Sequence, residues 1–417
     1  MPKDLVKGNQ IVKPFIVSAA IFFLAGSFIG SIWFALVLNA NIPMVNGSVF
    51  GLHRVFLVES GLTILIMGIG FMIVPRFRNI PIGSHAIIVI SFLSVVVSTF
   101  LVIVYTIGAY ELSSNENILF ISKILRVFGI LLFVGKMIDT LKIKPRLLRT
   151  ADYFVGLSSI CLLTLSVLSL LNLNDNTLTD IELQLLFPVI MIFGIEYKTL
   201  PSFMGFVRPR KKLGMLSLLL LAATFVLGLA TKLGISDSDA SQLLFNLFML
   251  SSSITFGISV YVYNNYENKK YILKSAKDKK ERFLYTLHHT RVSFCFLYVG
   301  IVMGLMFYVF DEKFMFYDLS IHYVAIGFIG ITIASYLPMM LAPILGKPIA
   351  VNRFYKVPLI LIIISLLTRT VGVVYISHFN GNGFTLLHAL TSTSGFLVVL
   401  AIVIFVALMY RSIKTNV

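Results

Sequence analysis

Long apolar stretches alternate with short polar segments along almost the whole chain. Each apolar stretch holds roughly 20 residues or more, which is the length that an α-helix needs to cross the ~30 Å hydrocarbon core of a bilayer. Twelve such stretches are predicted, numbered here as spans 1 to 12: 14–38, 50–75, 84–108, 117–141, 151–173, 182–206, 213–234, 240–263, 289–310, 318–343, 356–377 and 384–410. The pattern therefore predicts an all-α polytopic membrane protein with twelve transmembrane helices.

The composition of the chain supports this class. Of its 417 residues, 58% are hydrophobic and only 12% are charged, which is too apolar for a soluble globular protein. The two cysteines, Cys161 and Cys295, both fall inside spans, so they indicate packing positions and neither a disulfide nor a thiolate metal cluster. We expect a single twelve-helix membrane domain that covers residues 1–417.

The net charge of +16 is distributed unevenly between the loops. Lysine and arginine gather in alternate loops, whereas the intervening loops carry mainly acids, as in NDNTLTDIE and DEKFMFYD. This alternation follows the positive-inside rule and predicts a multi-pass protein of the cell membrane with both termini cytoplasmic. It also makes the basic linker 264–288 cytoplasmic, where anionic lipid headgroups are its expected partner, and it argues against nucleic acid as a partner.

A weak internal repeat has a period of four spans. Proline pairs close three of the spans at their cytoplasmic ends: Pro75 and Pro81 at span 2, Pro201 and Pro209 at span 6, and Pro343 and Pro348 at span 10. Prolines commonly end membrane helices, so coincidence is the alternative explanation. A true repeat would divide the protein into three units of four helices.

Three of the seven histidines lie about one helical turn inside the outer ends of even-numbered spans. They are His53 on span 2, His322 on span 10 and His388 on span 12. A rise of about 1.5 Å per residue places all three at a similar depth, so their imidazoles could face one another. Polar side chains at membrane depth are costly and usually need a partner, which makes a shared ligand site a reasonable hypothesis.

A glycine follows each of these histidines seven or eight positions later: Gly61, Gly330 and Gly395. Each glycine is expected nearly beneath its histidine on the same helix face, because helical side chains recur at that spacing. A flat helix surface there would suit a ring-sized cofactor bound by the imidazole. The alternative is that the glycines ease helix packing and the histidines are polar anchors at the membrane interface.

Three arginines are predicted inside spans, in the outer half of the membrane: Arg54 on span 2, Arg126 on span 4 and Arg369 on span 11. The propionates of a haem are anionic and would supply the counter-charge that such arginines need. The alternatives are an ion pair with Glu59 and, for Arg54, a side chain that extends to the lipid headgroups.

Span 6 carries its own pair of ionisable residues, in the segment FGIEYKTLP. Glu196 and Lys198 lie toward the cytoplasmic side of this span. A local ion pair between them and a role in proton relay are both open at this point.

Two segments resemble the NnrS family of membrane proteins. The span 10 segment SIHYVAIGFIGITIASYLPMMLAPILGKP has a histidine, a glycine-spaced apolar helix and a terminal glycine, basic residue and proline. The span 2 segment LHRVFLVESGLTILIMGIGFMIVPRF looks like the family's early histidine-bearing helix, with the family's His-x-His-Glu pattern reduced to His53. This resemblance implies twelve spans, bound haem and copper, and a role in nitric oxide or nitrosative stress or in denitrification.

The layout is also similar to that of the catalytic subunit of the haem–copper oxidases. In that family histidines on helices 2 and 10 hold a low-spin haem, and these positions correspond to His53 and His322. The family's copper needs a histidine on helix 6 and a His-His pair on helix 7, but spans 6 and 7 contain no histidine. The pair His288–His289 precedes span 9 on the cytoplasmic side, so only His388 and His378 are outer-side candidates for a second metal.

The function expected from these observations is that of an NnrS-like haem-binding membrane protein. The first alternative is a redox subunit like that of the haem–copper oxidases without the usual copper site, and the second is a twelve-span secondary transporter. Haem is the expected cofactor, with His53 and His322 as ligands to its iron, and copper is a second candidate. Membrane lipid and an electron-donor protein are the expected partners. Whether the protein is an enzyme stays open, because two axial histidines leave haem iron no free position.

Overall fold

The computed structural model describes residues 10–40, 47–78, 80–108, 116–142, 149–172, 177–203, 206–236, 238–264, 277–310, 313–345, 353–379 and 385–414. The described part of the chain is helical and contains no strand. Its elements are η1 (Gln10–Val12), α2 (Lys13–Ala40), α3 (Gly47–Arg54), η2 (Val55–Leu62), α4 (Thr63–Phe77), α5 (His85–Gly108), α6 (Glu116–Lys142), α7 (Thr150–Leu170), α8 (Thr177–Phe203), α9 (Lys211–Lys232), α10 (Ser238–Ser259), α12 (Lys277–Val309), α13 (Lys313–His322), η3 (Tyr323–Gly330), α14 (Ile331–Leu345), η4 (Arg353–Tyr355), α15 (Lys356–Phe379) and α16 (Thr385–Lys414).

Twelve of the described helical segments are long and apolar enough to cross a membrane, which confirms the predicted all-α polytopic fold. Large apolar side chains cover the outside of the bundle, among them Ile21, Leu219 and Val226, each about 60% exposed (59%, 63% and 63%). In water such a surface would aggregate, whereas in a bilayer it faces lipid chains. The chain is therefore a multi-pass membrane protein.

Spans 2, 6 and 10 form the interior of the bundle. In the most apolar stretch of each, 89%, 83% and 56% of the residues are buried, against 28–50% in the other nine candidate spans. Span 2 comprises α3, η2 and α4, span 6 is α8, and span 10 comprises α13, η3 and α14. Because the three most buried spans are four apart, their places in the bundle follow the period of the predicted repeat.

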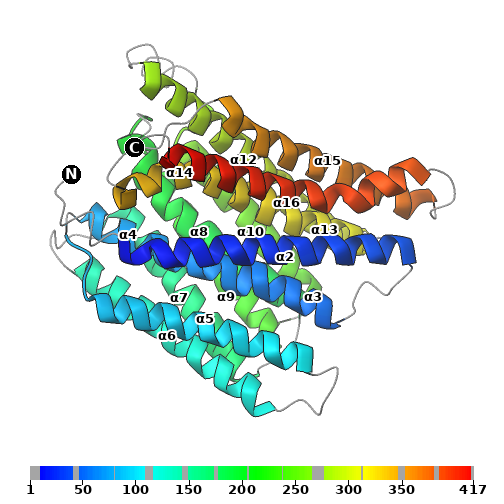
Figure 1. Cartoon of the computed structure of the whole chain (residues 1–417), viewed down its shortest axis with the longest axis horizontal. Coiled ribbons are helices and arrows are strands. Elements are labelled where there is room, and N and C mark those ends of the chain that lie inside the picture. Colours follow the sequence, from blue (N-terminus) through cyan, green and yellow to red (C-terminus); the bar gives the residue numbers. More distant parts are fainter. Residues whose placement is uncertain are drawn as a thin grey trace.

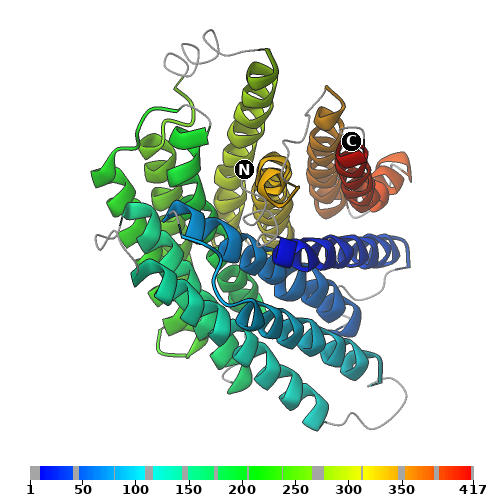
Figure 2. The same ribbon diagram turned by 60° about the vertical axis from the view of Figure 1, so that its left-hand side comes forward.

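The remaining helices surround these three, and the first and last spans meet. Sequential neighbours pack together as α5 with α6, α7 with α8, α9 with α10 and α15 with α16. Helix α16 also packs along α2, so the two ends of the chain lie side by side (Figure 1). Figure 2 shows span 10 between α12 on one side and the pair α15 and α16 on the other. This brings spans 1, 2, 10, 11 and 12 around one region.

The orientation in the membrane stays a prediction, and cysteine labelling tests it. Ser275 belongs to the basic linker and Asn176 to the acidic loop after span 5, and both lie outside the described residues. In a background with Cys161→Ala and Cys295→Ala, we expect Ser275→Cys to be shielded from a membrane-impermeant thiol reagent in intact cells. We expect Asn176→Cys to be labelled. The reverse pattern would mean that the protein has the opposite orientation in the membrane. Labelling of both cysteines would mean that the number of spans between them is not the predicted one.

Candidate functional site

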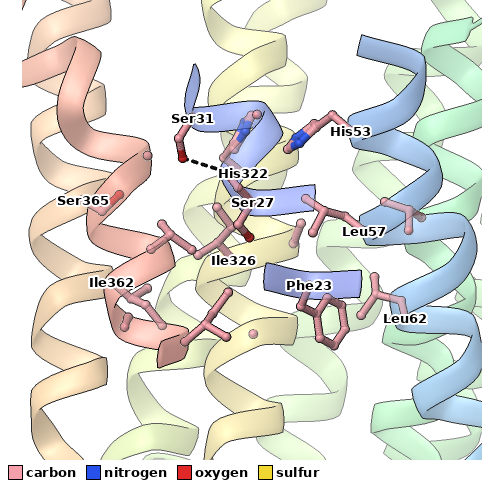
Figure 3. A pocket seen from close by; sticks show the side chains of 18 of the residues that line it. Phe23, Ser27, Ser31, His53, Leu57, Leu62, His322, Ile326, Ile362 and Ser365 are labelled. Atoms are coloured by element: carbon pink, nitrogen blue, oxygen red, sulfur yellow. Dashed lines mark hydrogen bonds between the residues drawn. The ribbon is translucent and has the colours of Figure 1, made fainter. Parts of the chain in front are cut away.

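A cavity of about 680 Å³ lies among α2, spans 2 and 10, α15 and α16. This volume is within the range of pockets that bind cofactors and drug-sized ligands, about 300–1,000 Å³. Most of the lining is apolar, with side chains such as Phe23, Leu57, Ile326 and Ile362 (Figure 3). The charged and ionisable lining residues are His53, Arg54, Tyr317, Asp318, His322 and Arg369.

His53 reaches the cavity from the end of α3 and rests against α2. Its Nδ1 lies 2.8 Å from the carbonyl oxygen of Gly26. Its ring also lies directly on Gly30, where an added Cβ would come within 2.2 Å of the imidazole Cε1. Glycine at position 30 therefore allows the imidazole to lie flat against α2, and the Gly26 carbonyl fixes its orientation.

His322 is the last residue of α13 and is held in a corresponding way. Its Nδ1 lies 2.7 Å from the carbonyl oxygen of Asp318, one turn earlier on the same helix. When Nδ1 of a neutral imidazole donates its proton to a carbonyl, Nε2 keeps the free lone pair that binds a metal. Figure 3 shows the two rings beside each other at one end of the cavity. The structure thus brings together the histidines of spans 2 and 10, as the matched depths predict.

A π-helical segment follows each of these two histidines. Segment η2 (Val55–Leu62) begins two residues after His53, and η3 (Tyr323–Gly330) begins immediately after His322. Hydrogen bonds from residue i to i+5 are rare in proteins and occur often at functional sites. The two inner spans therefore share a local structure at the depth of the cavity, and the wider turn changes which residues lie beneath each imidazole.

The predicted glycine surface is formed in part. Gly330 lines the cavity, and a Cβ added there would meet no atom closer than 3.5 Å. Gly395 also lines the cavity, but its Cβ would lie 2.7 Å from the Ser31 hydroxyl, so this glycine allows α16 to pack on α2. Gly61 is absent from the described lining, and its Cβ would press on the Phe23 ring at 2.9 Å. Of the three, only Gly330 offers an open face to a ligand.

Arg369 and Asp318 form a bidentate ion pair beside His322. The guanidinium donates from Nε and from an Nη, each 2.8 Å from one carboxylate oxygen of Asp318. It also stacks over the Phe34 ring at 3.8 Å from the centroid. The Asp318 Oδ1 lies 3.3 Å from His322 Nδ1, so the pair helps to orient the imidazole. Asp318 is not among the predicted site residues, because it ends the acidic segment DEKFMFYD, although its position four residues before His322 is a usable signal.

Arg54 and Arg126 both bind Glu59, which is the alternative raised from the sequence. Arg54 Nε lies 3.2 Å from one carboxylate oxygen of Glu59. Arg126 pairs with the other carboxylate oxygen and donates to the Glu59 carbonyl oxygen at 2.8 Å. Arg54 lines the cavity, but Arg126 is absent from its described lining. The role predicted for Arg126 toward a cofactor is untested, and its observed contacts are those of a structural ion pair.

The described residues do not offer a copper site. Within this part of the chain, no group of three or more histidine, cysteine, aspartate or glutamate side chains is arranged to hold a metal ion. His388 belongs to α16 and His378 to α15, but both side chains lie outside the described residues. Their roles, and the copper that they were expected to bind, therefore stay predictions.

Comparison with known proteins identifies the fold. No protein-family model and no curated protein sequence matches the chain. Among solved structures, the chain is similar to a heme-copper terminal oxidase, which was determined as a dimer by cryo-EM. The TM-score is 0.72 over 99% of this chain and 85% of that chain, with 12% sequence identity. This confirms the predicted haem–copper oxidase layout at the level of the fold, while membership of the NnrS family stays a prediction.

Proposed function

We propose that this protein is a redox membrane protein that binds a haem between His53 and His322. The observation that carries the proposal is the position of these two imidazoles, which enter one end of a single cavity from two of the inner spans. Both rings have Nδ1 at a backbone carbonyl, so Nε2 of each is the nitrogen available to a metal.

The residues around the cavity fit a haem in size and in chemistry. A largely apolar lining suits a porphyrin, and Gly330 keeps one wall open beneath His322. Arg54 and Arg369 also line the cavity, and each would meet an anionic propionate as a guanidinium group that is already paired with Glu59 or Asp318. The donor set is two neutral imidazoles, which suits iron in a bis-histidine haem.

The chain's own residues would control the properties of this site. A bound haem supplies an iron that takes up and releases one electron at a time. His53 and His322 would hold the iron of such a haem, Asp318 and Arg369 would keep the His322 ring in place, and the apolar lining would keep water away from it. An arrangement with two protein ligands favours electron transfer over the binding of a gaseous substrate.

The narrower role in nitric oxide or nitrosative stress is supported by the two NnrS-like segments, which contain His53 and His322. Such a role needs an electron-donor protein and, for catalysis, an axial ligand that can be displaced. A secondary transporter is the second candidate function, because twelve spans is the commonest transporter count and the inner spans enclose a cavity. The fold favours the redox protein over the transporter, since it is similar to that of a heme-copper terminal oxidase.

An absorption spectrum of the purified protein tests the proposal. We expect a Soret band that shifts on reduction with dithionite and the sharp visible bands of a low-spin haem. A pyridine haemochrome assay should show close to one haem per chain. A protein expressed in haem-sufficient cells that purifies without a Soret band, and gains none with added haemin, would contradict the assignment and favour the transporter.

Substitutions of Arg369 and of Arg126 should have different effects. Arg369→Leu leaves the Asp318 carboxylate buried without its partner, which costs about 3–5 kcal/mol in the free energy of unfolding. It should also lower haem retention or shift the midpoint potential, because Asp318 contacts His322. Arg126→Leu leaves Glu59 paired with Arg54 and should have the smaller effect on the haem. If Arg369→Leu keeps the wild-type haem occupancy and potential, Arg369 is a structural residue only.

A further inference from the structure

A group of polar side chains lies deep in the bundle at the junction of spans 6, 9 and 10. At its centre is Glu196 on α8, with 1% of its surface exposed. The Tyr336 hydroxyl on α14 lies beside this carboxyl group and beside the hydroxyls of Thr199 and Thr290. Tyr336, Thr199 and Thr290 are also buried, at 4%, 2% and 1% exposure. The group does not belong to the histidine cavity, because none of the four residues lines it.

The oxygen atoms of this group lie close to one another, but most of them form no hydrogen bond of ordinary geometry. Both carboxylate oxygens of Glu196, Thr290 Oγ1 and Tyr336 OH are buried and make no hydrogen bond of ordinary geometry. Thr332 and Ser335 lie on the same two turns of α14 as Tyr336. Their hydroxyls are also buried and make no hydrogen bond of ordinary geometry. Thr199 differs, since its hydroxyl donates to the Ile195 carbonyl at 2.9 Å. Buried polar atoms are almost always paired, so a concentration of unpaired oxygens from three helices indicates a ligand.

The Glu196 carboxyl group also has no ion-pair partner among the described residues. None of the ion pairs between described residues includes Glu196. Lys198, the partner suggested by the sequence, is only partly buried two residues further along α8. An isolated carboxylate in the interior of a membrane protein is costly, and such residues usually mark a binding site.

We propose that Glu196, Tyr336 and Thr290 form a binding site for a sodium ion within the membrane. The donor atoms are all oxygens, which hard cations prefer over softer metals. One carboxylate neutralises a monovalent cation, whereas a divalent ion would leave a net positive charge buried in the bilayer. A proton on Glu196 is the competing way to remove the charge, and the dependence of stability on pH and on salt described below separates it from a bound ion. The site is independent of the haem assignment.

Thermal unfolding of the purified full-length protein in detergent tests this site. NaCl is exchanged for choline chloride at constant ionic strength and pH. An ion that binds only the folded state raises Tm with the logarithm of its concentration once the site begins to fill. We expect this Na⁺ response in the wild type and its loss in Glu196→Gln. Thr290→Val removes one ligand and should raise the Na⁺ concentration at half effect by about tenfold, which corresponds to ~1.4 kcal/mol.

Glu182→Gln is the matched control. Glu182 is on the same helix and also has a carboxylate oxygen without a hydrogen bond. It lies 14 residues from Glu196, about 21 Å along the helix axis, and should keep the full Na⁺ response. If Glu196→Gln does not fold, Tyr336→Phe and Thr290→Val decide the question, together with binding of radioactive sodium to the wild type.

Three results would overturn the sodium site. The first is an equal Tm for the wild type in NaCl and in choline chloride. The second is a Na⁺ response that survives in Glu196→Gln. The third is a stability that depends on pH alone, identical in the two salts and abolished by Glu196→Gln, because Glu196 would then carry a proton in place of the ion.

Discussion

Replacing either His53 or His322 by alanine is expected to remove most of the Soret absorbance while the protein remains inserted in the membrane. Each imidazole supplies one axial ligand, and alanine provides no atom that could replace it. His322→Ala removes the contact with Asp318, but Asp318 keeps both hydrogen bonds from Arg369, so the helices should still pack. The measurement is the ratio of Soret to protein absorbance in purified samples, with membrane insertion checked by extraction from washed membranes.

His289→Ala is the matched control for these variants. His289 is buried at 1% exposure, and its Nδ1 also lies 2.8 Å from a backbone carbonyl, that of Tyr285. It belongs to α12 and does not line the cavity. This variant should therefore keep the wild-type spectrum. If His53→Ala and His322→Ala both keep it as well, the proposed ligation is wrong.

Much of the fold could be predicted because membrane helices are governed by a simple physical requirement. A span must be long and apolar, and these properties can be read from local sequence alone. Span 2, predicted at 50–75, is observed as Val49–Phe77, and span 12, predicted at 384–410, as Ala389–Ser412. The period of four also agrees with the burial of the spans, because spans 2, 6 and 10 are the three most buried of the candidate spans among the described residues.

The details of the cavity depend on contacts between helices, which the sequence does not display. The π-helical segments after His53 and His322 change the spacing that a regular α-helix would give, so Gly61 faces Phe23 and not the cavity. The roles of Gly26 and Gly30 arise only because α2 lies against the end of α3. No pattern within span 1 distinguishes these two glycines from others that ease helix packing.

Charged residues illustrate the same limit. The sequence placed Arg369 correctly inside span 11, but its partner Asp318 comes 51 residues earlier and was counted as a loop residue. Arg126 and Glu59 are 67 residues apart, and their pairing was one of two alternatives until the structure showed the contact. Identifying such partners requires knowing which helices are neighbours, which is a property of the tertiary structure.

Gly30→Ala is expected to abolish or strongly weaken haem binding although it removes no ligand. The added Cβ would lie 2.2 Å from Cε1 and 2.3 Å from Nδ1 of the His53 ring, which is closer than non-bonded atoms can approach. The imidazole must then leave its place against α2 and lose the contact with the Gly26 carbonyl at 2.8 Å. With its ring displaced, Nε2 no longer meets the axial position, and the effect should approach that of His53→Ala.

Gly51→Ala separates this mechanism from a general effect of replacing glycine at the cavity. Gly51 lines the same cavity, two residues before His53, and a Cβ added there would meet no atom within 4 Å. Alanine in the helix interior should raise stability by up to about 1 kcal/mol, and the spectrum should be unchanged. Haem titration of both variants makes the comparison. Wild-type affinity in Gly30→Ala would mean that His53 does not bind the haem from its place against α2, since the ring cannot keep that place beside the new methyl group.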